Sequence, residues 1–261
     1  MTENTAAPLV LKLSGKALGA EAELDRLFRA LKAARRTFLL VHGGGVEVDH
    51  LMERLNLPVR RIEGLRVSPA EDMPVIAGGL AGACSLALRG AVRRAGLTPL
   101  GLLVTDGGAA EVVPQDAALG RVAKTRAGSE AGRRALLGLI DAGWTPVVSS
   151  IGMDVEGRLW NINADDAALS VAELLAAPLV YLSDVPGVLD HEKRLIATLD
   201  AEGVEALIES GVVTGGMAVK VRAALSAARA TGAPVSIASI FDAALPDVVA
   251  NGGFPGTVMR A

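Results

Sequence analysis

Short apolar runs alternate with longer stretches in which apolar residues recur every three or four positions. Residues 9–13 have the pattern of a buried strand, and residues 38–41 repeat it. Between them, residues 21–36 place Leu24, Leu27, Phe28 and Leu31 at the spacing of one helix face. Residues 46–55 predict a second helix. The chain therefore opens as strand, helix, strand, helix.

The alternation continues to the end of the chain. Residues 59–67 predict a hairpin, with Gly64 suited to its turn, and residues 68–71 have the sequence of a helix start. Residues 106–128 predict short strands and turns. Further strands are predicted at residues 100–104, 146–149, 179–182, 234–239 and 256–259, and further helices at residues 75–95, 130–142, 165–175, 217–231 and 242–250. This order is typical of an α/β fold whose mainly parallel sheet is covered by helices on both faces.

Composition and charge narrow the class of protein. The 261 residues carry 26 basic and 29 acidic side chains, a formal charge of −3, without a long basic run, so a nucleic-acid partner is not expected. The N-terminus does not resemble a signal peptide, and no unbroken apolar stretch reaches 18 residues, so no membrane span is expected. The single cysteine, Cys84, rules out an internal disulfide and suits core packing. We therefore expect a cytoplasmic enzyme or binding protein.

Glycine clusters follow several of the predicted strands. They occur at residues 12–15, 42–45 and 184–187. In open α/β sheets ligands bind beyond the carboxyl ends of the strands, and glycines there let backbone N–H groups approach an anion. The clusters therefore indicate a phosphate site spread along one sheet edge, although each one alone could be an ordinary strand–helix turn.

Two lysines and two aspartates are notable, because they lie inside an apolar strand or near the start of a predicted helix. Lys12 interrupts an otherwise apolar strand, which is costly unless the lysine has a partner or a ligand. Lys220 lies near the start of a predicted helix, after two glycines. Asp165 and Asp166 open another helix, where acids commonly oppose the helix dipole.

Familiar motifs of other classes are incomplete. The P-loop pattern fails because Ala17 follows Gly15-Lys16, and the dinucleotide fingerprint fails because Val48 stands at its last glycine. The run at residues 42–45 has no matching G-x-S-x-G elbow of an esterase. No His or Cys cluster has zinc spacing, so any metal is expected to be Mg²⁺ that arrives with nucleotide phosphates.

Taken in order, these segments resemble the amino acid kinase family, and within it the branch that phosphorylates N-acetyl-L-glutamate. The resemblance runs nearly end to end and rests on residues 12–15, 42–45, 64–67, 161–165, 182–187 and 215–220. It implies a three-layer αβα sandwich with one continuous sheet. Residues 1–175 would bind the acyl-amino acid and mediate dimerisation, and residues 176–261 would bind ATP.

The resemblance also implies a role for each matching residue. Lys12 and Lys220 would stabilise the transferred phosphoryl group, and Asp165 would hold both lysines. Substrate binding is implied for Gly44, Gly45, Arg66, which would clamp a carboxylate, and Asn161, which would bind the acetamido end. Nucleotide binding is implied for Gly15, Asp184, Val185, Pro186, Gly187, Val188, Leu189, Val212, Val213 and Thr214.

The implied reaction uses Mg-ATP to convert N-acetyl-L-glutamate to N-acetyl-γ-glutamyl phosphate, in arginine biosynthesis. Because a carboxylate is already ionised, no general base is required. Ser14 and Gly215 depart from the family pattern, where Gly and Asp are usual. The short N-terminus resembles arginine-insensitive, homodimeric members. Alternatives are a kinase for carrier-linked aminoadipate, a uridylate kinase and a non-catalytic sensor of the same fold.

Overall fold

Strand β1 (Leu9–Leu13) shows how the sequence builds the layers. The computed structural model describes residues 7–260, so the interpretation of the extreme N-terminus falls outside the described residues. Side chains alternate across a strand, and Leu9, Leu11 and Leu13 pack in one apolar cluster while Val10 packs in another. Both faces of β1 are therefore buried, as expected for a central strand of a parallel sheet.

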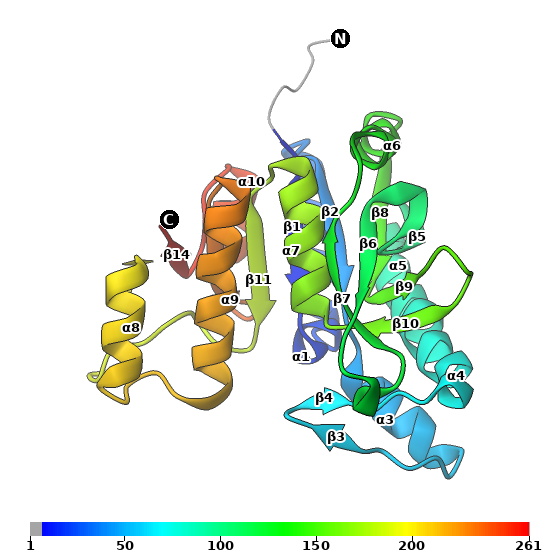
Figure 1. Ribbon diagram of the computed structural model, residues 1–261. Coiled ribbons are helices and arrows are strands. Elements are labelled where there is room, and N and C mark those ends of the chain that lie inside the picture. The colour runs from blue at the N-terminus through cyan, green and yellow to red at the C-terminus, as the bar shows by residue number, and fades with distance from the viewer. Residues whose placement is uncertain (1–6, 261) are drawn as a thin grey trace.

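Helices cover the two faces of the main sheet. Helices α2 (Glu21–Ala33), α5 (Ser85–Arg94) and α10 (Leu245–Ala250) belong to the layer that buries Leu11. Helices α6 (Glu130–Asp141), α7 (Ala164–Leu175) and α9 (Gly215–Thr231) supply the opposite layer, with α7 crossing in front of β1 and β2 in Figure 1. The predicted three-layer αβα sandwich is confirmed.

Within the described residues the main sheet runs in the order β12-β14-β13-β11-β1-β2-β8-β5. Neighbours are parallel except β13 and β14, which are antiparallel. The remaining strand bounds are β2 (Phe38–His42), β5 (Thr98–Leu103), β8 (Trp144–Ser149), β11 (Leu179–Ser183), β12 (Thr198–Leu199), β13 (Val235–Ser239) and β14 (Thr257–Met259). The carboxyl ends of β1, β2, β8 and β11 meet at one edge, where the glycine clusters follow.

Two smaller sheets flank that edge. Strands β6 (Ala110–Pro114), β7 (Val122–Ala127), β10 (Leu159–Ile162) and β9 (Ile151–Met153) pair in that order. Strands β3 (Arg61–Ile62) and β4 (Leu65–Arg66) form the predicted hairpin around Gly64, whose φ of +82° suits glycine. This hairpin, residues 61–66, is called the flap below; it projects beside α3 (Gly45–Arg54) (Figure 1).

The helical region after the flap is less regular than predicted. A short 3₁₀ turn (Ala70–Asp72) leads into α4 (Met73–Ala77), a π-helical segment η2 (Gly78–Cys84) and then α5. By length and composition alone, Ala70–Arg94 could cross a membrane, yet 44% of its most apolar window is buried inside the fold. Core helices of soluble proteins commonly satisfy the same criteria, and residues of this stretch pack in two apolar clusters.

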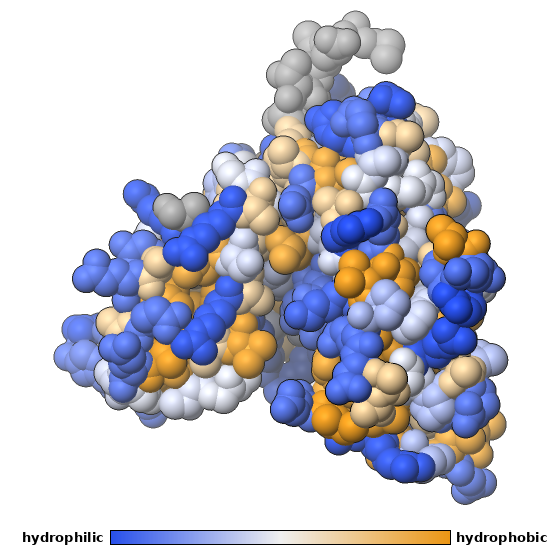
Figure 2. Space-filling view, in the orientation of Figure 1, coloured by the Kyte–Doolittle hydropathy of each residue, from blue (hydrophilic) through white to orange (hydrophobic). Residues whose placement is uncertain are grey.

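Most predicted elements are present, with shifted ends. Helix α2 ends at Ala33 rather than residue 36, because Arg35 takes a left-handed φ of +53°. The short helix α1 (Gly15–Leu18), α8 (Ala201–Glu209) and strands β9, β10 and β12 were not predicted. The hydrophobic surface is patchy in the view of Figure 2, and a hollow lies between the part built from α8 and α9 and the rest of the molecule.

Candidate active site

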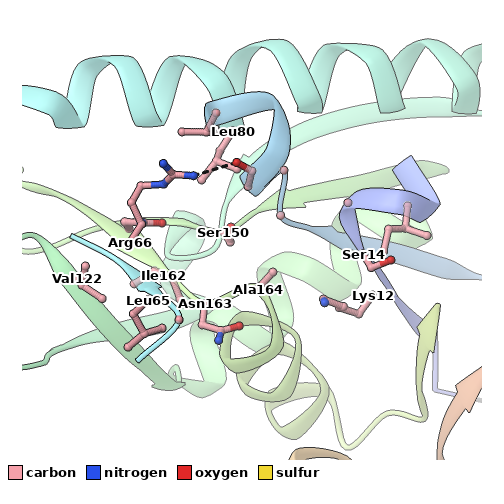
Figure 3. A pocket seen from close by; sticks show the side chains of 18 of the residues that line it. Lys12, Ser14, Leu65, Arg66, Leu80, Val122, Ser150, Ile162, Asn163 and Ala164 are labelled. Atoms are coloured by element: carbon pink, nitrogen blue, oxygen red, sulfur yellow. Dashed lines mark hydrogen bonds between the residues drawn. The ribbon is translucent and has the colours of Figure 1, made fainter. Parts of the chain in front are cut away.

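A pocket of about 280 Å³ opens at the carboxyl edge of the main sheet. Its lining brings together six of the residues that the resemblance implicated, although they come from four separate segments of the chain: Lys12, Gly15, Gly44, Gly45, Arg66 and Asn161. In Figure 3 the side chains of Lys12 and Arg66 lie at opposite sides of this pocket. The pocket therefore has a cation at each end and glycine-rich backbone between.

Lys12 has a carboxylate partner. Its Nζ lies 2.7 Å from Oδ1 of Asp165, at ion-pair distance but without the angle of a hydrogen bond. Only 12% of the Lys12 side chain is exposed. Asp165 is held at the first turn of α7, where Asn163 caps the helix by accepting a hydrogen bond of 2.8 Å from the Asp165 N–H. The buried lysine is thus paired and aimed at the pocket.

Lys220 belongs to the same electrostatic cluster. Burial lowers the pKa of the Lys220 ammonium below its usual value, and the positive charge of Lys12 lowers it further, while Asp165 and Asp184 raise it. The charges of Lys12 and Asp165 thus act on Lys220, although Lys220 does not line the pocket. Two neighbouring cations that share one acid are suited to an anionic ligand.

The glycine loop after β2 is shaped by its neighbours. Gly44 has φ of +150°, and a Cβ placed on it would lie 2.3 Å from Sγ of Cys84. Gly45 begins α3, so its N–H is among those that no helical carbonyl accepts. Helix N-termini of this kind bind anions well. Gly44 and Gly45 line the pocket, and the absence of a side chain at Gly44 allows the close approach of the η2 segment.

His42, directly before that loop, is not placed for proton transfer. Its ring is fully buried, and its Nδ1 lies 2.8 Å from the carbonyl oxygen of Gly43. Burial lowers the pKa of this imidazole, so the ring is neutral at pH 7. The site offers charge and alignment rather than a general base.

Arg66 lies opposite Lys12 (Figure 3), and Asn161 also lines the pocket. Arg66 is held by α3: its Nη1 lies 2.6 Å from Oδ1 of Asp49, and its Nη2 donates to the Gly45 carbonyl at 2.9 Å. Asn161 on β10 donates from Nδ2 to Oγ of Ser68 at 3.0 Å. The Asn161 carbonyl oxygen is thereby left as the acceptor of this side chain.

The residues implied in nucleotide binding lie outside this pocket's lining, apart from Gly15. Val188 and Val213 are buried in one apolar cluster, so their side chains contribute to the core and only their backbone could touch a nucleotide. Asp184 follows β11 and pairs with Lys16; this ion pair holds the pKa of the Asp184 carboxyl below its usual range. Thr214 precedes α9.

The two departures from the family pattern have local structural roles. Ser14 caps α1, because its Oγ accepts a hydrogen bond from the Ala17 N–H at 3.4 Å. Gly215 has φ of +53° at the first residue of α9, a conformation that favours glycine over aspartate. Both substitutions are therefore accommodated by the backbone that carries them.

Sequence reasoning missed several polar residues of the site. Asp49 forms ion pairs with both Arg66 and Arg61, and Lys16 pairs with Asp184. The buried hydroxyl of Tyr181 lacks a hydrogen-bond partner in the described structure. Tyr181 is paired in register with Lys12, and burial followed by the charge of Asp165 raises the pKa of its hydroxyl. The sequence signal for Tyr181 was a polar group inside an apolar strand, which is the kind of signal that pointed to Lys12 in its own strand.

Known proteins resemble this chain along almost its whole length. The profile of the amino acid kinase family matches residues 7–239. The acetylglutamate kinase of Pectobacterium carotovorum subsp. carotovorum (strain PC1) is 47% identical over 258 residues, which cover 97% of this chain and 99% of that protein.

Solved structures agree with the fold. The smu.665 protein of Streptococcus mutans UA159 superposes with a TM-score of 0.78 at 27% identity, covering 97% of this chain and 98% of that one. The carbamate kinase of Giardia gives 0.67 at 17% identity, covering 98% and 99%, and shares the fold alone. The match of family profile, relatives and architecture confirms the resemblance drawn from the motifs, and the chain belongs to the amino acid kinase family.

Proposed function

We propose that this protein transfers the γ-phosphoryl group of ATP to the γ-carboxylate of N-acetyl-L-glutamate, a step of arginine biosynthesis. The products are ADP and N-acetyl-γ-glutamyl phosphate. The similarity to an acetylglutamate kinase over 97% of the chain supports this substrate. The observation that carries the proposal is the paired Lys12 at one end of a pocket whose other end holds Arg66.

The chemistry follows from that arrangement. An oxygen of the substrate carboxylate attacks the γ-phosphorus, the bond from that phosphorus to the bridging oxygen breaks, and ADP leaves with the electron pair. Charge on the transferred group needs neutralising, and alignment matters more than covalent help. Lys12 and Lys220 would supply the positive charge, and Asp165 would keep both ammonium groups in place.

The substrate would lie along the pocket. Its γ-carboxylate would meet the N–H groups of Gly44 and Gly45 near Lys12, and its α-carboxylate would meet the Arg66 guanidinium, whose planar N–H groups match a carboxylate. The Asn161 carbonyl oxygen would accept the acetamido N–H, because its amide nitrogen already donates to Ser68.

The nucleotide would occupy the adjoining side of the sheet edge. Gly15, residues 184–189 and residues 212–214 are the proposed contacts. Among residues 7–260, no three His, Cys, Asp or Glu side chains are grouped to hold a metal ion. Mg²⁺ would therefore be held mainly by the ATP phosphates and would supply further neutralisation of their charge.

Trapping the acyl phosphate tests the proposal. Hydroxylamine is added with Mg-ATP and either N-acetyl-L-glutamate, glutamate or aminoadipate, and ADP release is followed with UMP. We expect a hydroxamate with N-acetyl-L-glutamate alone. ADP release with UMP would point instead to a nucleotide kinase, and inactivity with all four would favour a carrier-linked substrate or a sensor. Either result would overturn the proposed substrate.

A further inference from the structure

The carboxylate of Asp49 lies between the two arginines of the flap. Its Oδ1 is 2.6 Å from Nη1 of Arg66, and its Oδ2 is 2.6 Å from Nη2 of Arg61. Both arginines line the pocket, one from each strand of the flap. Asp49 itself belongs to α3, the helix that begins at Gly45. One acid thus ties the flap to the helix that carries the glycine loop.

Among residues 7–260, each ion pair and hydrogen bond of the Arg66 head group is made with α3. Besides Asp49, Nη2 donates to the Gly45 carbonyl at 2.9 Å and Nη1 lies 3.4 Å from the sulfur of Met52. Only 6% of the Arg66 side chain is exposed. A guanidinium has five N–H donors. The hydrogen bonds to Met52 and Gly45 use one hydrogen of Nη1 and one of Nη2, while the Asp49 carboxylate lies against Nη1 as an ion pair. The Nε–H and one Nη2–H remain, which is enough for the two oxygens of one carboxylate.

We propose that Asp49 is a positioning residue of the substrate site, which holds Arg66 and Arg61 as one clamp for the α-carboxylate of the acyl-amino acid. The inference rests on the proposed function, since it assigns that carboxylate to the flap. The three side chains together carry one net positive charge, which matches a single carboxylate. Arg61, at 39% exposure, holds the outer oxygen of Asp49 and so fixes the acid from the solvent side.

A simple counter-charge role predicts the opposite result. If Asp49 only offset the arginines, its neutralisation would leave two cations at the pocket and strengthen the binding of an anion. If it orients Arg66, neutralisation frees the guanidinium to rotate, and binding weakens despite the added net charge. The direction of the change in affinity therefore separates the two roles.

The test compares the wild type with Asp49→Asn, and with Glu53→Gln as a control on the same helix, where Glu53 is exposed. Calorimetric titration with N-acetyl-L-glutamate in the absence of ATP gives the affinity, and hydroxamate formation gives KM and kcat. We expect Asp49→Asn to weaken binding and raise KM about tenfold or more, with a smaller change in kcat and none in Glu53→Gln.

Affinity equal to or tighter than the wild type in Asp49→Asn would overturn the proposal. Should that variant fold poorly, Arg61→Ala serves instead, because it removes the outer partner of Asp49 and one cation of the clamp; it should raise KM, and unchanged KM would also contradict the clamp. A wild type that forms no hydroxamate would refute the proposed function. An active wild type together with unchanged affinity and KM in Asp49→Asn would refute this inference alone.

Discussion

Lys12 occupies a strand whose other four residues are apolar, and its ammonium forms an ion pair with Asp165. The cost of burying a lysine makes such a position rare unless the charge is used. The ion pair with Asp165 offsets that cost, and the pocket beside it provides a place where the charge can act on a ligand.

Replacement of Lys12 by alanine should abolish most of the transition-state stabilisation at that end of the pocket. We expect Lys12→Ala to lower kcat by roughly 10²-fold or more, as for the loss of a preorganised donor. Hydroxamate formation at saturating substrates measures it, with exposed Lys32→Ala as the matched control. Near-normal turnover in Lys12→Ala would remove this lysine from the mechanism.

If Lys220 stabilises the transferred phosphoryl group as proposed, its lowered pKa should limit the activity at alkaline pH. An ordinary lysine has a pKa of about 10.4. The pKa of Lys220 is lower, so its ammonium loses its proton at a lower pH. As pH rises through the pKa, the cation is lost, so kcat/KM for ATP should fall on the alkaline side. In Lys220→Arg the charge persists and this fall should move to higher pH, whatever the absolute rate. Superimposable alkaline profiles in the two enzymes would contradict this assignment.

At the scale of elements, the loop after β2 and the η2 segment form one unit. Gly44 and Cys84 are in close contact, and Leu80 of η2 lines the pocket. Burial followed by the charge of Glu47 raises the pKa of the Cys84 thiol to about 11, so the thiol is neutral and serves as packing. The irregular π-helical turn lies where a long helix passes the substrate loop, a common place for such turns.

Substitution of Gly44 should therefore disturb both the loop after β2 and the η2 segment. Gly44→Ala adds a Cβ 2.3 Å from the Cys84 sulfur and occupies a φ that other residues avoid. We expect about 1–3 kcal/mol of lost stability in chemical denaturation. Gly45→Ala is the stability control, because its Cβ would meet nothing within 4 Å. Cys84→Ala combined with Gly44→Ala should recover part of the loss; no recovery would mean that backbone strain alone explains it.

How far the sequence predicts these elements depends on the range of the contacts that form them. The hydrophobic pattern of the sequence located β1, α2, β2 and α7 well. Burial in the main sheet or against it determines which positions of these strands and helices are apolar. The strands β9 and β10 were missed because a Gly- and Asp-containing turn interrupts them. The π-helical segment lies against Gly44, a contact between distant parts of the sequence that local pattern does not reveal.

The site shows the same division. Lys12, Asp165 and the glycine loops follow from their place at the strand ends and helix starts. Asp49 and Arg61 were not predicted. A charged residue on a helix or in a hairpin is usually exposed to solvent, so neither position indicated a site. Only the fold of the flap onto α3 brings them together.

At the scale of the whole molecule, helix α5 leaves the large apolar side chain of Leu86 59% exposed. The homodimer implied by the family resemblance would cover surface of this kind. We expect light scattering to give about twice the chain mass of 26.7 kDa. Leu86→Glu should shift the mass toward one chain if this face takes part; an unchanged dimer would place the interface elsewhere.

The central position of β1 has a consequence for motion. This strand is hydrogen-bonded to β2 on one side and to β11 on the other, so the two proposed binding regions meet across a continuous ladder rather than at a hinge. Opening of the pocket for substrate must then come from movement of peripheral segments such as the flap. In hydrogen–deuterium exchange the amides of β1 and β11 should be the slowest to label and those of the flap among the fastest. Added N-acetyl-L-glutamate should slow the flap and leave the ladder unchanged.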